Sequence, residues 1–452
     1  MAGIFKAYDI RGVYPDEINE SIARKIGLSF HYILDAEDRA MGNTVVVSRD
    51  MRSHSAPLAE ALISGLRQSG LDVVDIGLAT TPMNYFAVGH LKASGGIQVT
   101  ASHNPAQYNG MKLSRREARP VSGDHGLPLL EQKVGADEQP VSMRSGDLTQ
   151  AAVFEAYGSH VLSFLRRPAD ALRLKVVVDA ANGMGTIYQP LLEMMGIELI
   201  PLYFKLDGNF PNHEANPLKL ENLSDLCDKV RATRADLGIA FDGDGDRAAF
   251  VDENGEPIGS DLITALIAGE LLKRDPGKHV LYDLRSSRAV PAYITECGGI
   301  PVRERVGHSF MKATLRAKDG IFGGELAGHY YYRDNYYADC ALMAVVEILN
   351  LLWSNGQQLS ELVQPLYRYA KSPEINFQVE DKQAMMKMLA ERYSNGEIDH
   401  LDGITVQYPD WWFNVRPSNT EPYLRLVLET NGRGELERRR HELQEMLGTP
   451  SG

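Results

Sequence analysis

Cysteine, long apolar runs and net positive charge are all scarce in this sequence. Three cysteines occur among 452 residues, and Cys227, Cys297 and Cys340 are too far apart to match the spacing of metal ligands, so we expect a reducing compartment. Acidic residues outnumber basic ones by 60 to 47, and the net charge of −13 argues against a protein whose main ligand is nucleic acid. A hydrophobic share of 44% is typical of globular proteins rather than disordered or fibrous ones.

No apolar segment is long enough for membrane insertion. The N-terminal residues lack the apolar core of a signal peptide. The most apolar stretch, residues 341–353, contains Glu347 and is shorter than a bilayer span, so it predicts a buried amphipathic helix. From these absences we expect a soluble, cytoplasmic protein without a membrane partner.

Length and pattern predict several α/β units. At about 150 residues per domain, the chain would hold about three domains. Polar stretches at residues 135–148, 254–255 and 371–374 divide it further, giving predicted domains at 1–148, 149–253, 254–368 and 369–452. The first three have the alternation of βαβ units around mainly parallel sheets, and the last is a smaller α+β segment. Strands are predicted at 45–47, 73–76, 96–100, 174–178, 237–241, 280–283, 320–322 and 424–429, and a charged helix at about 434–447.

A polar loop follows the predicted strand at residues 96–100. It reads Thr-Ala-Ser-His-Asn-Pro, and Ser102 beside His103 could act as a nucleophile or carry a phosphoryl group. The same residue types also favour an ordinary turn. Ala101 and His103 do not fit the nucleophile elbow of a serine hydrolase. Taken alone, the loop favours the turn.

Three aspartates at alternate positions form the clearest chemical motif. Glycines between Asp242, Asp244 and Asp246 let the backbone curl so that the carboxylates face one centre, and oxygen ligands select Mg²⁺ or Ca²⁺. An EF-hand does not fit, because Arg247 stands where that loop needs glycine. Mg²⁺ commonly takes a further oxygen from a phosphate, so a phosphorylated Ser102 becomes an attractive fourth ligand.

Two further segments could bind a sugar phosphate. Residues 416–420, Arg-Pro-Ser-Asn-Thr, combine an arginine with three polar side chains on a tight turn, which favours phosphate, although an ordinary turn before a strand has the same composition. Glu325 could accept hydrogen bonds from sugar hydroxyls, and His329 could donate to them or move a proton. Arg305 could pair with an anion or simply form a surface ion pair.

Taken together, these motifs resemble the α-D-phosphohexomutase family, in particular its phosphomannomutase/phosphoglucomutase branch. The resemblance covers the whole chain in order. It implies three related α/β domains with mixed sheets and a smaller α+β C-terminal domain around a central cleft. The segments that carry it are 8–12 (Tyr-Asp-Ile-Arg-Gly), 100–105, 207–212 (Asp-Gly-Asn-Phe-Pro-Asn), 242–247, 324–329 and 416–420.

The resemblance also implies roles for individual residues. Ser102 would carry the phosphoryl group and would bind Mg²⁺ together with Asp242, Asp244 and Asp246. The reacting end would be lined by Tyr8, Arg11, His103, Lys112 and Arg247. The sugar and its distal phosphate would be held by Arg285, Arg305, His308, Glu325, Ala327, His329, Arg416, Ser418, Asn419 and Thr420.

The reaction implied by the resemblance interconverts hexose 1-phosphate and hexose 6-phosphate, of mannose or glucose, through a hexose 1,6-bisphosphate. Small hexose phosphates would be the partners, glucose or mannose 1,6-bisphosphate the activator, and the protein a monomer or homodimer. The general base stays open among His103, His329 and Lys112. Two alternatives also stay open: a sugar-phosphate phosphatase, and a non-catalytic sugar-phosphate-binding relative.

Two positions depart from the family pattern. Ala327 stands where the sugar loop usually has a serine, so one hydroxyl contact is missing or supplied by water. Arg285 stands where some relatives carry a lysine proposed in proton transfer. Because an arginine does not readily release a proton, Arg285 is expected to hold charge instead.

Overall fold

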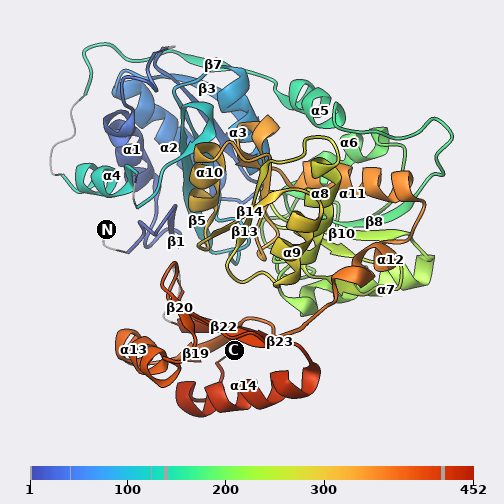
Figure 1. Cartoon of the computed structure of the whole chain (residues 1–452). Coiled ribbons are helices and arrows are strands. Elements are labelled where there is room, and N and C mark those ends of the chain that lie inside the picture. The colour runs from blue at the N-terminus through green and yellow to red at the C-terminus, as the bar shows by residue number, and fades with distance from the viewer. Residues whose placement is uncertain (1–2, 41, 124, 137–140, 419–422, 452) are drawn as a thin grey trace.

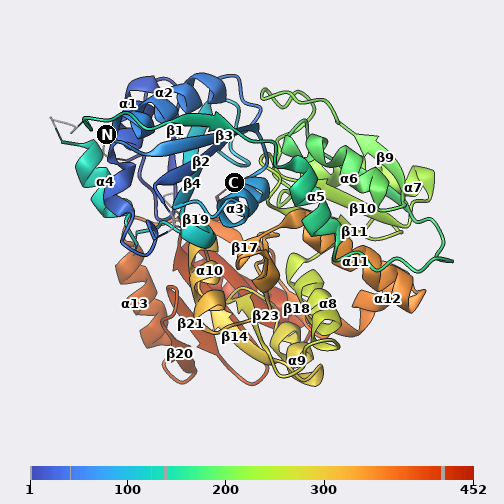
Figure 2. The same cartoon turned by 90° about the horizontal axis from the view of Figure 1, so that it is seen from above.

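The structure is a computed structural model that describes residues 3–40, 42–123, 125–136, 141–418 and 423–451. Its strands form four sheets, each built from a consecutive part of the chain. The first three lie together, and the fourth lies beneath them (Figure 1). Seen from above, the first three follow one another around the molecule, with strands of the fourth under the third (Figure 2). The four-part architecture implied by the resemblance is therefore confirmed, while the exact domain bounds stay a prediction.

The first sheet is mixed. Its strands are β1 (Ile10–Val13), β2 (Thr44–Arg49), β3 (Asp72–Leu78), β4 (Gly95–Val99), β5 (Tyr108–Arg115), β6 (Arg119–Pro120) and β7 (Leu148–Gln150). The helices beside it are α1 (Glu20–Ser29), α2 (Ser55–Gln68), α3 (Thr81–His90) and α4 (Leu127–Val134). In the order β1-β5-β4-β2-β3-β7, the strands from β4 to β7 run parallel and β1-β5-β4 run antiparallel. Val45 and Val47 pack with α1 and α2 while Val46 packs with α3, so the β-branched run is buried on both faces.

The second sheet has the order β12-β11-β10-β8-β9. Its strands are β8 (Lys175–Asp179), β9 (Glu198–Leu202), β10 (Leu237–Phe241), β11 (Ala248–Val251) and β12 (Pro257–Ile258). Helices α5 (Phe154–Leu162), α6 (Gln189–Met194) and α7 (Ser224–Thr233) belong to this unit. β10 pairs parallel with β8 and antiparallel with β11, so the turn between β10 and β11 projects from one edge of the sheet. That turn contains the three aspartates.

The third sheet has the order β14-β13-β15-β16-β17. Its strands are β13 (His279–Asp283), β14 (Ile300–Glu304), β15 (Phe322–Gly324), β16 (Tyr330–Tyr332) and β17 (Ala338–Asp339). The helices are α8 (Ser260–Leu272), α9 (Ala289–Glu296), α10 (His308–Ala317), α11 (Ala341–Asn355) and α12 (Leu359–Val363). β15 and β16 form an antiparallel hairpin whose connection, residues 325–329, is the predicted sugar loop.

The fourth sheet is antiparallel, as the smaller α+β unit requires. Its strands are β18 (Ala370–Lys371), β19 (Ile375–Gln378), β20 (Glu397–Asp399), β21 (Ile404–Gln407), β22 (Trp411–Pro417) and β23 (Tyr423–Thr430). Helices α13 (Lys382–Arg392) and α14 (Arg433–Leu447) pack on it around Phe413, Leu428 and Leu443. The charged helix predicted at 434–447 is thus confirmed.

Most predicted strands are confirmed, and two predictions need correction. The strand predicted at 320–322 begins only at Phe322, because residues before it close the C-terminal end of α10: Gly320 donates its amide proton to the carbonyl of Leu315. The helix predicted over 341–353 exists as α11, but it is not amphipathic. Its residues 341–352 are all buried, Glu347 included. Within the part of the chain that the structure describes, no helix combines the length and apolar character that crossing a bilayer would need.

Candidate active site

Ser102 lies just beyond the end of β4, at the junction of the first and second sheets. Its side chain is fully buried, and its backbone adopts a left-handed conformation with φ of 51°. Its Oγ donates a hydrogen bond to Asp242 Oδ2 at 2.9 Å and lies 3.2 Å from His103 Nδ1. A Cβ on Gly243 would come within 2.3 Å of the Ser102 carbonyl oxygen, so only glycine permits this approach. The structure thus brings the predicted serine and aspartate loops into direct contact.

Arg52 holds the Ser102 loop in place, and the sequence analysis did not identify it. Its buried guanidinium donates hydrogen bonds of 2.6–3.1 Å to the backbone carbonyls of four loop residues, Ser102, Asn104, Pro105 and Tyr108. The guanidinium carbon also lies 5.0 Å from the centre of the Phe210 ring, which belongs to the 207–212 segment. Four carbonyls bound by one planar cation leave the loop little freedom.

Asp50 completes this support. Its Oδ2 accepts hydrogen bonds from Arg52 Nε at 3.2 Å and from Thr100 Oγ1 at 2.7 Å, and Thr100 Oγ1 accepts one from the Ser102 amide at 2.9 Å. A signal for both residues was present in the sequence. They follow the predicted strand at 45–47, and the carboxyl ends of neighbouring parallel strands meet at one edge of a sheet.

The three aspartates lie in the turn between β10 and β11. Each offers a carboxylate oxygen within 4.8 Å of the others. Asp242 Oδ1 accepts hydrogen bonds from the amides of Asp246 and Arg247, both at 3.1 Å, and Gly245 has a φ of +73°, so the backbone curls as predicted. Among the described residues, the buried atoms Asp244 Oδ1 and Asp246 Oδ1 have no hydrogen-bond donor. An all-oxygen donor set with unused oxygens fits a hard divalent cation.

Lys112 reaches this cluster from β5. Its Nζ donates to Asp244 Oδ2 at 2.7 Å and to Asp246. Burial alone would favour the neutral amine, but the surrounding carboxylates raise the pKa of Lys112 above its usual range. Burial and the neighbouring Asp246 and Asp244 raise the pKa of Asp242. Three carboxyl groups thus share two cations, Lys112 and Arg247, and Asp242 is the one whose ionised form is disfavoured while no divalent cation is bound.

His329 connects the metal loop to the third sheet. Its Nε2 accepts a hydrogen bond from Arg247 Nε at 3.0 Å, so its Nδ1 carries the proton and donates to Asp339 Oδ2 at 2.9 Å. Lys312 Nζ donates to Asp339 Oδ1 at 3.1 Å. Although burial opposes ionisation, Lys312 and His329 hold the pKa of Asp339 well below its usual range. Neither Asp339 nor Lys312 was predicted, since no local motif marks them.

The remaining residues predicted for the reacting end come from the first unit. Arg11, on β1, pairs with Asp9 and donates to Asn104 Oδ1 at 2.6 Å. Tyr8 packs edge-on against His308, with 4.8 Å between the ring centres. Burial, together with nearby cations, lowers the pKa of His103 well below its usual range and keeps its imidazole neutral.

The predicted sugar loop is held by the protein's own donors. The buried carboxylate of Glu325 accepts hydrogen bonds from the Gly307 amide at 3.1 Å and from the Tyr331 hydroxyl. Ala327 is half-buried. His308 begins α10, 6.1 Å from His329 between ring centres, and neither of its ring nitrogens has a hydrogen-bond partner among the described residues. Arg305, by contrast, stacks on Phe310 at 3.4 Å.

A second charged centre joins the third and fourth sheets. Glu374 pairs with Arg416 at 2.9 Å, Arg285 at 3.3 Å and Arg425 at 3.2 Å. Burial opposes ionisation of this carboxyl, but the three arginines lower the pKa of Glu374 to about 2. Arg285 also pairs with Asp283 at 2.7 Å, which agrees with a charge-holding role. Glu374 lies in a segment that the sequence analysis treated only as a boundary.

The predicted turn at residues 416–420 needs correction. Arg416 and Pro417 belong to β22 rather than to a turn. The Arg416 side chain is only 1% exposed, because it packs beside Glu374 and forms an ion pair with it. Ser418 follows the strand and donates its amide proton to the carbonyl of Tyr423 at 2.9 Å. Asn419 and Thr420 lie outside the described residues.

Family models match nearly the whole chain. Four models of phosphoglucomutase/phosphomannomutase match in order: alpha/beta/alpha domain I at residues 2–140, domain II at 155–255, domain III at 259–369 and the C-terminal domain at 374–446.

Individual relatives agree with this match. The chain is 40% identical over 448 residues to a protein of Xanthomonas campestris pv. campestris (strain B100) named "Phosphohexose mutases", covering 98% of both chains. It is 38% identical to a phosphomannomutase of Escherichia coli (strain K12), covering 95% of both. A crystal structure of a phosphoglucomutase/phosphomannomutase family protein from Burkholderia thailandensis superposes with a TM-score of 0.89 at 35% identity, covering 98% of this chain and 96% of that one.

Proposed function

Since the chain belongs to the phosphoglucomutase/phosphomannomutase family, we propose that it interconverts hexose 1-phosphates and hexose 6-phosphates by passing a phosphoryl group through Ser102. The observation that carries this proposal is the 2.9 Å contact between Ser102 Oγ and Asp242 Oδ2. It puts the phosphoryl carrier beside a buried group of carboxylates suited to a divalent cation. A serine in an ordinary surface turn would not need such a partner.

The three aspartates would hold the cation, with an oxygen of phosphorylated Ser102 as a further ligand. When bound, Mg²⁺ would neutralise negative charge on the phosphoryl group during its transfer. Asp244 Oδ1 and Asp246 Oδ1, which lack hydrogen bonds among the described residues, are the oxygens available for it.

The transfer exchanges one oxygen–phosphorus bond for another. The free hydroxyl of a hexose phosphate attacks the phosphorus, the bond to Ser102 Oγ breaks, and a hexose 1,6-bisphosphate forms. The hydroxyl proton passes to a basic side chain, and the carboxylates keep Lys112 protonated, which leaves His103 and His329 as candidates. His329 can accept a proton at Nε2 only after Arg247 Nε has released its hydrogen bond to that atom. Lys112 and Arg247 hold positive charge beside the moving group. After the bisphosphate turns end for end, its other phosphate returns to Ser102.

The non-reacting phosphate would sit at the arginine centre. The three arginines of this centre have two carboxylates as partners, Glu374 and Asp283, so a phosphate there adds negative charge where positive charge is in excess. Ser418 lies beside them, and Asn419 and Thr420 follow in sequence. Glu325 and His308 would contact the sugar between the two centres.

Both mannose and glucose phosphates should be substrates, with kcat/KM values within about one or two orders of magnitude of each other. The two sugars differ only at the C2 hydroxyl, and turning the bisphosphate end for end moves that hydroxyl. A tight C2 contact would therefore hinder one of the two orientations, and Ala327 removes a polar group from the sugar loop. Parallel steady-state assays measure this, and a preference beyond about a thousandfold would show a dedicated C2 contact.

A coupled mutase assay with trace glucose 1,6-bisphosphate tests the proposed function. We expect conversion of the 1-phosphate to the 6-phosphate, stimulation by the bisphosphate, and little inorganic phosphate. Stoichiometric release of inorganic phosphate would instead identify a phosphatase. Binding of hexose phosphate without turnover would identify a non-catalytic relative.

A further inference from the structure

A cavity of about 220 Å³ lies away from the active site. It is bounded by the chain that follows α5, the end of α8, the far end of the β15–β16 hairpin and α11. The hairpin connection that carries His329 is at one end of β16 and Tyr332 at the other, so the strand separates the two sites by roughly 10 Å. At about 30 Å³ per water, the cavity has room for a ligand equivalent to roughly seven waters.

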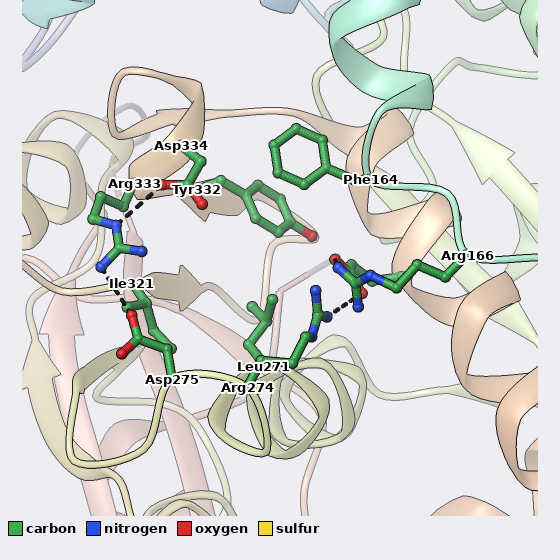
Figure 3. A pocket seen from close by; sticks show the side chains of 10 residues that line it. Phe164, Arg166, Leu271, Arg274, Asp275, Ile321, Tyr332, Arg333 and Asp334 are labelled. Carbon is green, nitrogen blue, oxygen red and sulfur yellow. Dashed lines mark hydrogen bonds and ion pairs between the residues drawn. The ribbon is translucent and has the colours of Figure 1, made fainter.

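Two buried polar atoms face this cavity without a hydrogen-bond partner among the described residues: the Tyr332 hydroxyl and Glu347 Oε1. The residues are 3% and 1% exposed. Figure 3 shows the Tyr332 hydroxyl on the side where the guanidinium groups of Arg166 and Arg274 converge, with the Phe164 ring above it. A buried polar group without a partner is costly, so a molecule that accepts a hydrogen bond from the Tyr332 hydroxyl, or from Glu347 when this carboxyl is protonated, is stabilised on binding.

The cations around these atoms determine which molecule fits. Arg166 Nη2 lies 3.8 Å from Glu347 Oε1, an ion-pair distance that is too long for a hydrogen bond. Arg274 Nη2 donates to Glu347 Oε2 at 2.8 Å. The ends of both arginines are partly exposed, so they can reach an anion from solvent. The Tyr332 hydroxyl adds a third donor.

We propose that this cavity binds the oxyanion group of a small metabolite, a phosphate or a carboxylate, between Arg166, Arg274 and the Tyr332 hydroxyl. Arg333, on the other side, is already neutralised by Asp275 and Asp334, each 3.1 Å away, and takes no part. The proposal is independent of the proposed function, because none of these residues belongs to the active site.

Glu347 makes the site sensitive to pH. Burial raises the pKa of Glu347 to about 7; among its neighbours, Arg166 lowers this pKa and Glu270 raises it. Arg274 and the Tyr332 hydroxyl also face this carboxyl. Once protonated, Glu347 no longer repels an anion and frees charge on both arginines. An anion should therefore bind with uptake of one proton, about tenfold more tightly at pH 6 than at pH 8.

Calorimetric titration with sulfate tests the site, because sulfate keeps its charge between pH 6 and pH 8. At pH 6 we expect the wild-type protein to bind one more sulfate than Arg166→Gln. The matched control Arg144→Gln removes a charge from an exposed arginine elsewhere and should bind as the wild type does. Equal sulfate stoichiometry in Arg166→Gln and the wild type would overturn the proposal.

Glu347→Gln tests the proton linkage with a conservative change. Its amide mimics the protonated carboxyl, so the Arg166-dependent site should bind sulfate at pH 8 about as tightly as the wild type does at pH 6. An unchanged pH dependence in this variant would refute the role of Glu347. Titration with malonate distinguishes the two ligand sources. If sulfate has the lower dissociation constant at the Arg166-dependent site, the site prefers phosphate-like groups. If malonate has the lower dissociation constant, the site prefers carboxylates.

Discussion

Around Ser102, three carboxyl groups face one lysine and one arginine, whereas around Glu374, three arginines face two carboxylates, those of Glu374 and Asp283. The first centre attracts a cation and the second an anion. In a chain of net charge −13, the second centre is a local excess of positive charge, as the proposed phosphate site requires. The bisphosphate intermediate of the proposed reaction, with a phosphoryl group at each end, would lie between the two centres.

The two centres also differ in how they are built. The aspartate centre joins the first three units, but each of its loops is held within one unit: the aspartates lie in one tight turn, and the hydrogen bonds of Arg52 fix the Ser102 loop. The arginine centre draws Arg285 from the third unit and Arg416 and Arg425 from the fourth. Its geometry therefore depends on how these two units meet. Changes at the first centre should affect the rate of turnover, and changes at the second should affect substrate binding and the docking of the fourth unit.

Replacing the phosphoryl carrier should have the largest effect. Ser102→Ala removes the only oxygen that the proposed transfer uses on the protein, so kcat should fall by at least about 10³-fold, or about 4 kcal/mol in activation free energy. A coupled mutase assay measures the loss. Ser122→Ala changes another buried serine of the same unit and should retain activity. Full turnover by Ser102→Ala would contradict the assignment of the carrier.

Asp244→Asn should have the next largest effect. Loss of one of three carboxylates weakens a hard cation's site by several kcal/mol, so both Mg²⁺ affinity and kcat should fall roughly 10²-fold. Metal titration monitored by activity measures both. Asp236→Asn, an exposed aspartate of the same unit, is the control and should change neither. Activity that survives exhaustive chelation would rule out the metal centre.

Arg52→Lys tests the claim that the Ser102 loop is fixed within the first unit. A lysine keeps the charge but cannot bind four carbonyls at once, so kcat should fall about 10- to 100-fold while KM changes less than about threefold. Arg67→Lys is a matched control, because Arg67 donates to the carbonyl of Gly146 away from the site. A rise in KM with normal kcat would place Arg52 in substrate binding instead.

Glu374→Gln tests the second centre, where the smallest effect on turnover is expected and the main effect is on stability. The pKa of Glu374, about 2, lies below that of an unfolded glutamate, so its carboxylate stabilises the fold above about pH 4.5. That contribution, up to about 3 kcal/mol, is lost as pH falls from about 4.5 to 2.

The Tm of Glu374→Gln should therefore lie several degrees below the wild-type value at pH 7 and approach it near pH 3. Trp411 and Trp412, on β22, report the unfolding of the fourth unit by fluorescence. Glu437→Gln, on the exposed face of α14, controls for loss of a surface charge. An equal Tm difference at both pH values would show that the ion pairs do not support docking.

Local patterns predicted much of this molecule, and long-range geometry accounts for what they missed. Strands such as β2 and β8 stand out as short β-branched runs, and the aspartate turn follows from its spacing alone. β5 escaped prediction because its sequence, Tyr-Asn-Gly-Met-Lys-Leu-Ser-Arg, lacks β-branched residues and contains a glycine and an asparagine that favour turns. Its position between β1 and β4, rather than intrinsic propensity, makes it a strand.

In the candidate site too, local motifs could be identified from the sequence and long-range contacts could not. Residues in contiguous motifs, such as Ser102 and Asp242, could be identified from sequence. Asp339 and Glu374 could not, because each acts on a residue far along the chain: Glu374 and Arg416 are 42 positions apart. For Arg52 the sequence indicated a place, the end of a predicted strand, but not its partner Ser102, 50 positions away. A lone charged residue in the sequence does not reveal which distant group it pairs with.

Transfer of label from Ser102 tests the central claim most directly. The protein, carrying a ³²P-phosphoryl group on Ser102, is mixed with one equivalent of unlabelled glucose 1-phosphate and quenched within a single turnover. The account predicts that the label leaves Ser102 and appears in glucose 1,6-bisphosphate and then in glucose 6-phosphate, with almost none as inorganic phosphate. Label that stays on Ser102 while product forms, or that appears as inorganic phosphate, would contradict it.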